Sequence, residues 1–113
     1  MHEASLMETA LELAMEQARA AGASRIHRLC LRVGELSGVV PEALEFAFAA
    51  LTPGGPAAGA VLEIESIPAM RWCDSCQAEF EALEALPECP SCGEWSHRLR
   101  SGLELELASL EVS

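Results

Sequence analysis

The amino-acid sequence predicts an α+β protein in which a three-stranded mixed sheet carries two helices on one face. The first observation is two segments with apolar residues at helical spacing, which begin near residues 5 and 41. The second is the alternation of apolar and polar residues over 25–33, 61–67 and 103–112, which is typical of β-strands. The third is two Cys-x-x-Cys pairs between the last two strands, which predict an inserted zinc-ribbon module.

The first helix is predicted over residues 5–21. Its apolar positions recur every three or four residues: Leu6, Ala10, Leu13, Ala14 and Ala18. Ser5, followed three residues later by Glu8, fits a capping box and predicts where the helix begins. Gly22 is well placed to end the helix, because glycine accepts the left-handed backbone of a C-terminal cap. Residues 1–4 are then expected to form a short arm ahead of the helix.

The first strand and the second helix follow in the sequence. Within 25–33, one face of the strand carries Leu29, Leu31 and Val33, and the other carries Arg28, Cys30 and Arg32. Pro41 predicts the start of the second helix, since proline is favoured in the first helical turn. The apolar stripe of this helix comprises Val40, Leu44, Ala47, Phe48 and Leu51.

Two more strands complete the predicted sheet. Residues 52–60, with three glycines and two prolines, are expected to form a loop before the strand at 61–67. In 103–112 the apolar phase shifts by one residue after Leu107, which predicts a β-bulge near Ala108 or Ser109. We therefore expect an α/β domain formed by residues 1–68 together with 101–113, and a zinc-ribbon domain at 69–100.

The four cysteines of the inserted module have the spacing of a tetrahedral metal site. They are arranged as Cys73-x-x-Cys76, twelve residues, then Cys89-x-x-Cys92. Two residues between cysteines let one tight turn direct both thiolates at a single ion, and two such turns supply four sulfur ligands. A complete sulfur shell leaves no position for water, which predicts a structural zinc site. Iron also suits four sulfurs, so a rubredoxin-like electron carrier is one alternative.

The composition argues against several functional classes. Eighteen acidic and seven basic residues give a net charge of −11, which disfavours binding to nucleic acids or anionic membranes. No apolar stretch approaches the roughly 20 residues that cross a bilayer, and no signal peptide is visible, so we expect a cytoplasmic protein. No Ser-His-Asp set, phosphate loop or paired-carboxylate cleft is recognised, so we do not expect an enzyme.

The start of the chain, Met1-His2-Glu3, can bind a divalent transition metal. A free α-amine, the following deprotonated amide and the imidazole of His2 can form fused chelate rings. Planar, nitrogen-rich sites of this kind suit Ni(II) or Cu(II). By itself, however, a histidine at position two is more often an exposed terminal residue, because chain ends are commonly disordered.

Four features of the sequence together resemble one family. They are the Met1-His2-Glu3 start, the Arg32-Val33-Gly34-Glu35 stretch, the paired Cys-x-x-Cys motifs and the terminal Leu-Glu-Leu strand. The chain is similar, over essentially its full length, to the HypA/HybF family of hydrogenase nickel-incorporation proteins. The resemblance implies a nickel metallochaperone in which His2 is the principal Ni²⁺ ligand, Met1 contributes its backbone amine and Glu3 lies alongside.

The same resemblance implies the partners of the protein. It suggests delivery of nickel to the large subunit of nickel-iron hydrogenase, together with a maturation GTPase, and in some organisms a role for urease. We expect a monomer or a weak homodimer. The main alternative is a zinc-stabilised protein-interaction adaptor without a nickel role, which predicts that changing His2 has no effect.

Five other residues are assigned structural roles. His27 is expected to be a hydrogen-bonded strand histidine rather than a ligand. His97 is expected to lie near the zinc sulfurs or to be exposed. Cys30 is interpreted as a small half-buried strand residue, and Trp72 and Trp95 as side chains that pack around the metal or the domain junction.

Overall fold

The computed structural model describes residues 2–82 and 86–113, and the chain forms two compact units. The first unit comprises Met1–Arg32, Val39–Glu65 and Glu106–Ser113, and the second comprises Val33–Gly38 and Ser66–Leu105. The domain division expected from the sequence stays a prediction. None of the described helices is long and apolar enough to cross a membrane.

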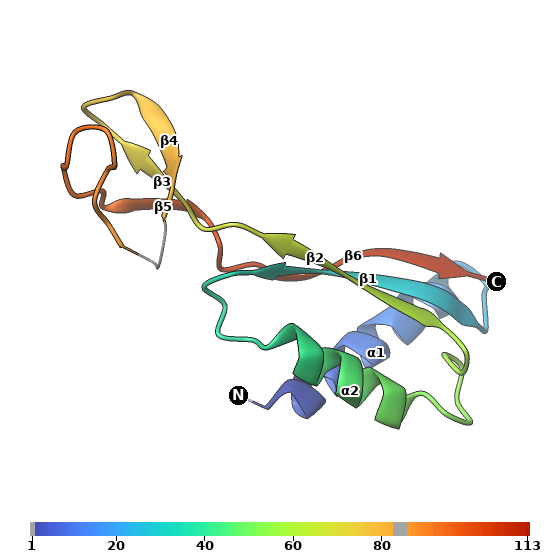
Figure 1. Ribbon diagram of the computed structural model, residues 1–113. Coiled ribbons are helices and arrows are strands. Elements are labelled where there is room, and N and C mark those ends of the chain that lie inside the picture. Colours follow the sequence, from blue (N-terminus) through green and yellow to red (C-terminus); the bar gives the residue numbers. More distant parts are fainter. Residues whose placement is uncertain (1, 83–85) are drawn as a thin grey trace. The chain divides into compact units, whose positions relative to one another are not determined.

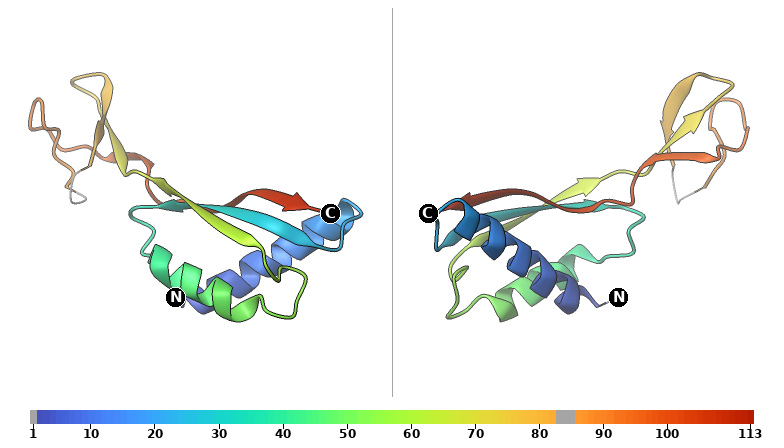
Figure 2. Two further views of the ribbon diagram at one scale, coloured as in Figure 1. Left: turned by 45° about the vertical axis from the view of Figure 1, so that its right-hand side comes forward. Right: turned by 180° about the vertical axis from the view of Figure 1, so that it is seen from behind.

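The main sheet has three strands in the order β2-β1-β6. Strand β1 (Ile26–Gly34) is central, with β2 (Val61–Ile67) and β6 (Leu105–Val112) at its sides. Strands β1 and β2 run in the same direction and β6 runs in the opposite one (Figure 1). Helices α1 (Glu3–Ala20) and α2 (Pro41–Leu51) lie on the same face of the sheet (Figures 1 and 2). This arrangement confirms the predicted fold class.

Helix α1 begins at Glu3, two residues earlier than predicted. His2 is the N-cap residue, its carbonyl accepts the N–H of Leu6 at 3.1 Å, and no side chain caps this end. Ser5 therefore lies inside the helix, and the predicted capping box of Ser5 and Glu8 is wrong. The helix extends to Glu3 because the Glu3 carboxylate accepts the N–H of Val40 and is also stabilised by the positive end of the helix dipole. Glu3 and Ala4, predicted to belong to the arm, are therefore part of the helix, and His2 is its N-cap.

The other end of α1 agrees with the prediction. The helix ends at Ala20, and Gly22 has a φ of +76°. The N–H of Gly22 donates to the carbonyl of Arg19 at 3.0 Å, and the N–H of Ala23 donates to that of Ala18 at 2.8 Å. This pair of bonds is a Schellman motif, which satisfies carbonyls that the helix itself leaves without partners.

The core between the helices and the sheet is built from one stripe on each element. It comprises Met7, Ala14 and Ala18 of α1, Ile26, Leu29, Leu31 and Val33 of β1, and Leu44, Ala47 and Phe48 of α2. Leu13, predicted in the core, is 45% exposed, whereas Met7 is completely buried. Apolar residues occupy more than one side of α1, so spacing alone did not determine which side faces inward.

The opposite face of the sheet carries a ladder of ion pairs centred on β1. Arg28 pairs with Glu63 of β2 and Glu111 of β6, and Arg32 pairs with Glu65 of β2 and Glu106 of β6. Both arginines thus connect the central strand to its two neighbours. For Arg32 the N–O distance is 3.7 Å to Glu65 and 3.3 Å to Glu106. Half-buried Cys30 lies on the same face, between the arginines in sequence.

The last strand is shorter than predicted. Strand β6 begins at Leu105, and Leu103 lies outside it with 62% of its surface exposed. Partial burial falls on Leu107, Leu110 and Val112, so the phase changes by one residue where the sequence indicated.

The second unit contains a smaller sheet with the order β4-β3-β5. Strand β3 (Met70–Cys73) pairs antiparallel with β4 (Ala78–Glu81) and with β5 (Arg98–Ser101). An isolated antiparallel bridge joins Glu88 to Trp95. These short pairings place the two Cys-x-x-Cys turns in the same unit.

The contacts of the Val33–Gly38 segment explain why glycine and glutamate occur in the Arg32-Val33-Gly34-Glu35 stretch. A Cβ atom at Gly34 would lie 2.1 Å from the carbonyl oxygen of Gly102, so no other residue fits here. The N–H of Glu35 donates to the carbonyl of Ile67 at 2.9 Å, and its carboxylate accepts the N–H of Ala69 at 3.2 Å. The Gly34-Glu35 pair therefore holds three segments of the second unit together.

Candidate metal centre

The four cysteines predicted as ligands lie together. The sulfur atoms of Cys73, Cys76, Cys89 and Cys92 are all within 4.8 Å of one another. Cys73 and Cys92 are separated by 3.5 Å between sulfurs, and Cys76 and Cys89 by 3.9 Å. A tetrahedron with Zn–S bonds of about 2.3 Å has sulfur–sulfur edges of about 3.8 Å. The cluster therefore has the size that a tetrahedral zinc ion requires.

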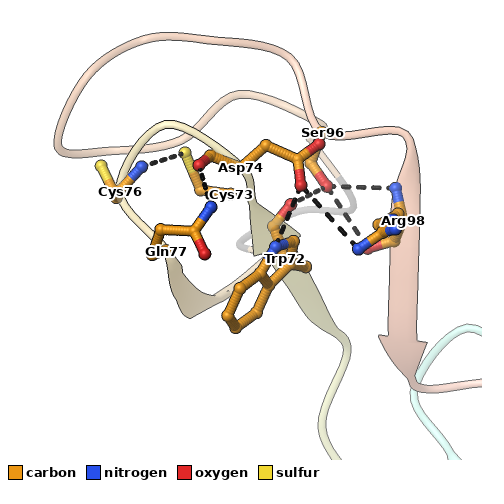
Figure 3. Close-up of polar contacts among 7 residues, drawn as sticks. All are labelled: Trp72, Cys73, Asp74, Cys76, Gln77, Ser96 and Arg98. Carbon is orange, nitrogen blue, oxygen red and sulfur yellow. Dashed lines mark hydrogen bonds and ion pairs between the residues drawn. The ribbon is translucent and has the colours of Figure 1, made fainter.

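The first turn, residues 73–77, is closed by hydrogen bonds around Cys73. The N–H of Cys76 donates to the sulfur of Cys73 at 3.4 Å (Figure 3). Cys73 is also paired with Ala78 across the hairpin. Gln77 has a φ of +53°, the left-handed conformation that reverses the chain after Cys76. Backbone N–H groups directed at sulfur stabilise thiolate charge, so the turn positions the ligands and favours their ionised form.

The second turn, residues 89–93, repeats this design. The N–H of Gly93 donates to the carbonyl of Cys89, and the N–H of Cys89 donates to that of Glu94, both at 2.8 Å. Gly93 has a φ of +77° and is equivalent to Gln77, because each follows the second cysteine of its pair. The hydroxyl of Ser75 donates to the carboxylate of Glu94 at 2.6 Å and so joins the two turns.

The four sulfurs affect one another's ionisation. Hydrogen bonds from the backbone N–H groups of Cys92 and Ser91 lower the pKa of Cys89 to about 7. Hydrogen bonds to the sulfurs of Cys92, Cys73 and Cys89 raise the pKa of Cys76 to about 12. Neighbouring negative charges oppose each further ionisation, so four thiolates this close together require a positive ion to neutralise them.

Side chains around β3 support the first turn from outside the cluster. The indole of Trp72 donates to the carboxylate of Asp74 at 3.1 Å, and Arg98 pairs with the same carboxylate at 3.8 Å (Figure 3). The hydroxyl of buried Ser96 donates to the carbonyl of Trp72 at 2.6 Å. The guanidinium of Arg100 lies 4.7 Å from the centre of the Trp72 ring, a cation–π contact. Sequence reasoning assigned no role to Asp74, Ser96 or Arg100, because their contacts depend on strand pairing.

The remaining candidates in this unit and on the sheet do not join the cluster. Trp95 is 65% exposed, so the expectation that it packs around the metal is wrong. His97 is exposed, as one of the two expectations allowed. His27 is also exposed and hydrogen-bonds through Nε2 to the hydroxyl of Ser113, which confirms the expected hydrogen-bonded histidine.

The start of the chain forms a second candidate site, in the first unit. His2 is exposed at the N-cap of α1, and Met1 lies outside the described residues. The Glu3 carboxylate accepts the backbone N–H of Val40 at 3.1 Å. That bond, together with the N–H of Glu3 itself, lowers the pKa of the Glu3 carboxyl group. The imidazole of His2 is therefore presented to solvent from a fixed helix start.

The amide groups at this end are suited to metal binding. The first N–H groups of a helix have no acceptor within the helix. His2 lies at the N-cap and Glu3 follows it, so deprotonation of their amides would break no helical hydrogen bond. The arrangement offers nitrogen ligands without loss of helix structure.

The fold and the four-cysteine cluster define a small protein with one closed site suited to binding a metal ion. The chain belongs to the HypA family, because the family model described as hydrogenase/urease nickel incorporation, metallochaperone, matches residues 1–112. This confirms the family resemblance inferred from the sequence.

Curated relatives and solved structures agree with this assignment. The hydrogenase maturation factors HypA of Acidithiobacillus ferrooxidans and Picosynechococcus are 41% and 42% identical over 112 residues, with 99% of each chain covered. The solution structure of the Ni metallochaperone HypA from Helicobacter pylori matches with a TM-score of 0.68 and 26% identity, covering 99% of this chain and 97% of that one. A second HypA solution structure matches with a TM-score of 0.71 and 27% identity, covering 100% and 97%.

Proposed function

We propose that this protein binds Ni(II) at its N-terminus and delivers it during maturation of nickel-iron hydrogenase. The observation that carries the proposal is the exposed His2 at the N-cap of α1, in a chain that belongs to a family of nickel-incorporation metallochaperones. The recipient would be the hydrogenase large subunit, with a maturation GTPase as a further partner. The family description also includes urease, so urease is a second possible client.

The N-terminal site suits transfer rather than storage. The His2 imidazole is the principal protein ligand, and the Met1 amine and the His2 amide that lies between them complete a planar set of nitrogen ligands. Such a site has few protein ligands and is open to solvent. A recipient can therefore replace the ligands one at a time, whereas a buried cage would oppose transfer.

Glu3 is assigned a positioning role within this proposal. Its carboxylate is occupied by the N–H of Val40, which fixes the first turn of α1 and hence the position of His2. The nickel contact of Glu3 would then be through its amide nitrogen rather than its carboxylate.

Zinc would be held by Cys73, Cys76, Cys89 and Cys92, where the sulfur spacing and the need for a cation both fit it. The ion would supply positive charge and crosslink the two turns. With four sulfur ligands it would have no free coordination position for catalysis. The family match does not favour the adaptor or the electron carrier as the function.

The test is a nickel titration of tag-free protein by calorimetry, with zinc content measured by mass spectrometry, repeated on His2→Ala. Changing a partner of a metal ligand typically costs about 10–100-fold in affinity, and removal of the ligand itself should cost at least as much. The matched controls are His27→Ala and His97→Ala, because both histidines are exposed. They should keep nickel affinity, and all variants should keep one zinc. Unchanged nickel binding in His2→Ala would place the site elsewhere. No nickel binding in the wild-type protein or in any variant would favour the adaptor.

A further inference from the structure

A groove with a volume of about 500 Å³ lies beside the start of α1, in the first unit. The start of α1 lies next to α2 in all views (Figures 1 and 2). The residues that line the groove are His2, Glu3 and Ala4 from the start of α1, and Ala43, Phe46, Ala47, Ala50 and Leu51 from α2. One of the lining residues is therefore the principal nickel ligand of the proposed function.

The lining of the groove is mostly apolar. Ala43, Ala47 and Ala50 follow helical spacing along one side of α2, and their small side chains leave the space that forms the groove. Phe46 is 78% exposed at its border, and Leu51 is 39% exposed. Burial of a phenylalanine side chain is favourable, so the exposed Phe46 makes this surface favourable for an apolar contact.

The surroundings of the groove are acidic. Glu3 lines the groove, and Glu42 is exposed one helical turn before Phe46 on α2, which contains no lysine or arginine. On α1 the only basic residue is Arg19, about 24 Å along the helix from Glu3 at a rise of about 1.5 Å per residue. The other arginines nearest in sequence to the groove residues, Arg28 and Arg32, lie on the opposite face of the sheet in ion pairs.

Charge complementarity selects the occupant. A basic segment is attracted to an acidic border, whereas a second copy of this chain, with a net charge of −11, is repelled. We propose that the groove docks a segment of the nickel recipient that presents one large apolar side chain flanked by lysine or arginine. The inference rests on the proposed function and adds to it a docking surface. Docking there brings the ligands of the recipient next to His2, so nickel passes directly between the two proteins.

The experiment measures binding to the metal-free large-subunit precursor of the nickel-iron hydrogenase from the same organism. Affinity is determined by biolayer interferometry for wild type, Phe46→Asp and the matched control Leu13→Asp, each first titrated with nickel. Leu13 is a suitable control because it is 45% exposed on α1 and does not line the groove. A second variant, Glu42→Gln, removes the acidic group one helical turn from Phe46.

We expect Phe46→Asp to weaken precursor binding about tenfold or more, with nickel affinity unchanged, and Leu13→Asp to bind as wild type. The Glu42→Gln variant should bind more slowly and show less dependence on salt. Equal precursor affinity for wild type and Phe46→Asp, with nickel binding intact, would overturn the docking groove alone. Self-association of wild type that Phe46→Asp abolishes would overturn it in favour of a second copy as the occupant. Loss of nickel binding in wild type itself would instead contradict the proposed function.

Discussion

At the residue scale, the two cysteine turns depend on the residue that follows each second cysteine. Gln77 and Gly93 both have left-handed backbones, with φ of +53° and +77°. A residue with a Cβ atom loses about 1–2 kcal/mol in this conformation relative to glycine. No atom lies within 4 Å of a Cβ placed at Gly93, so a substitution there changes the backbone cost without a steric clash.

We predict that Gly93→Ala destabilises the zinc-loaded second unit by about 1 kcal/mol. The measurement is urea unfolding followed by tryptophan fluorescence, which reports on this unit because Trp72 and Trp95 both belong to it. Gln77→Gly is the control, since it removes the same backbone cost from the equivalent position and loses one exposed bond to Asp74. Gln77→Gly should be no less stable than wild type. An unchanged midpoint for Gly93→Ala would contradict the argument.

At the scale of secondary-structure elements, one hydrogen bond joins the starts of the two helices. The Glu3 carboxylate in the first turn of α1 accepts the N–H of Val40, the N-cap residue of α2. The bond satisfies an N–H at the start of α2 that the helix itself leaves without an acceptor. It also lowers the pKa of Glu3, so the ionised carboxylate is favoured in the folded protein.

We predict that Glu3→Ala reduces the hydrogen-exchange protection of the Val40 amide, measured by NMR, while Glu3→Gln keeps part of it through the amide oxygen. Because the folded pKa of Glu3 is lowered, the stabilising bond is complete above the ordinary carboxyl pKa. It is lost as the pH falls through the lowered value. Protection at Val40 in wild type should therefore fall on acidification and that in Glu3→Gln should not. Equal pH dependence in both proteins would exclude Glu3 as the titrating group.

Local signals in the sequence were sufficient for several elements. Pro41 marks the start of α2 and Gly22 the end of α1, and the strand predicted at 61–67 is observed with the same bounds. The start of α1 was missed because the group that binds the Glu3 carboxylate lies 37 residues away in the chain. The need for glycine at position 34 was also missed, since it arises from the close approach of Gly102.

The same contrast between local signals and long-range contacts applies to the candidate sites. The spacing of the cysteines was enough to predict that their sulfurs come together, because each turn is local and the two turns are alike. The groove beside His2 could not be predicted, since it depends on how the start of α1 lies against α2. The alanines that form it have the same spacing as an ordinary buried stripe.

At the scale of the whole molecule, the two units differ in what stabilises them. The first unit has its own apolar core, in which Met7, Ile26, Leu29 and Leu44 are fully buried. The buried cluster around the metal centre of the second unit consists of Cys73, Phe80 and Cys89, and two of these three residues are proposed zinc ligands. Small units with so little apolar core usually need a metal or a disulfide to remain folded.

We predict that removal of zinc unfolds the cysteine-containing part of the second unit and leaves the first unit folded. Each sulfur must lose its proton to bind zinc, so zinc affinity falls as the pH falls. Cys89, whose pKa is lowered to about 7, gains a proton below that pH when zinc is absent. A chelator at neutral pH, or acidification, should therefore collapse the amide NMR signals of residues 70–81 and 98–101 while those of α1 and α2 remain dispersed. Cys89→Ser should behave like the chelator, whereas Cys30→Ser, at a half-buried position in the other unit, should keep its zinc. Dispersed signals for the strands β3 and β5 in metal-free protein would show that their hydrogen bonds are sufficient without the ion.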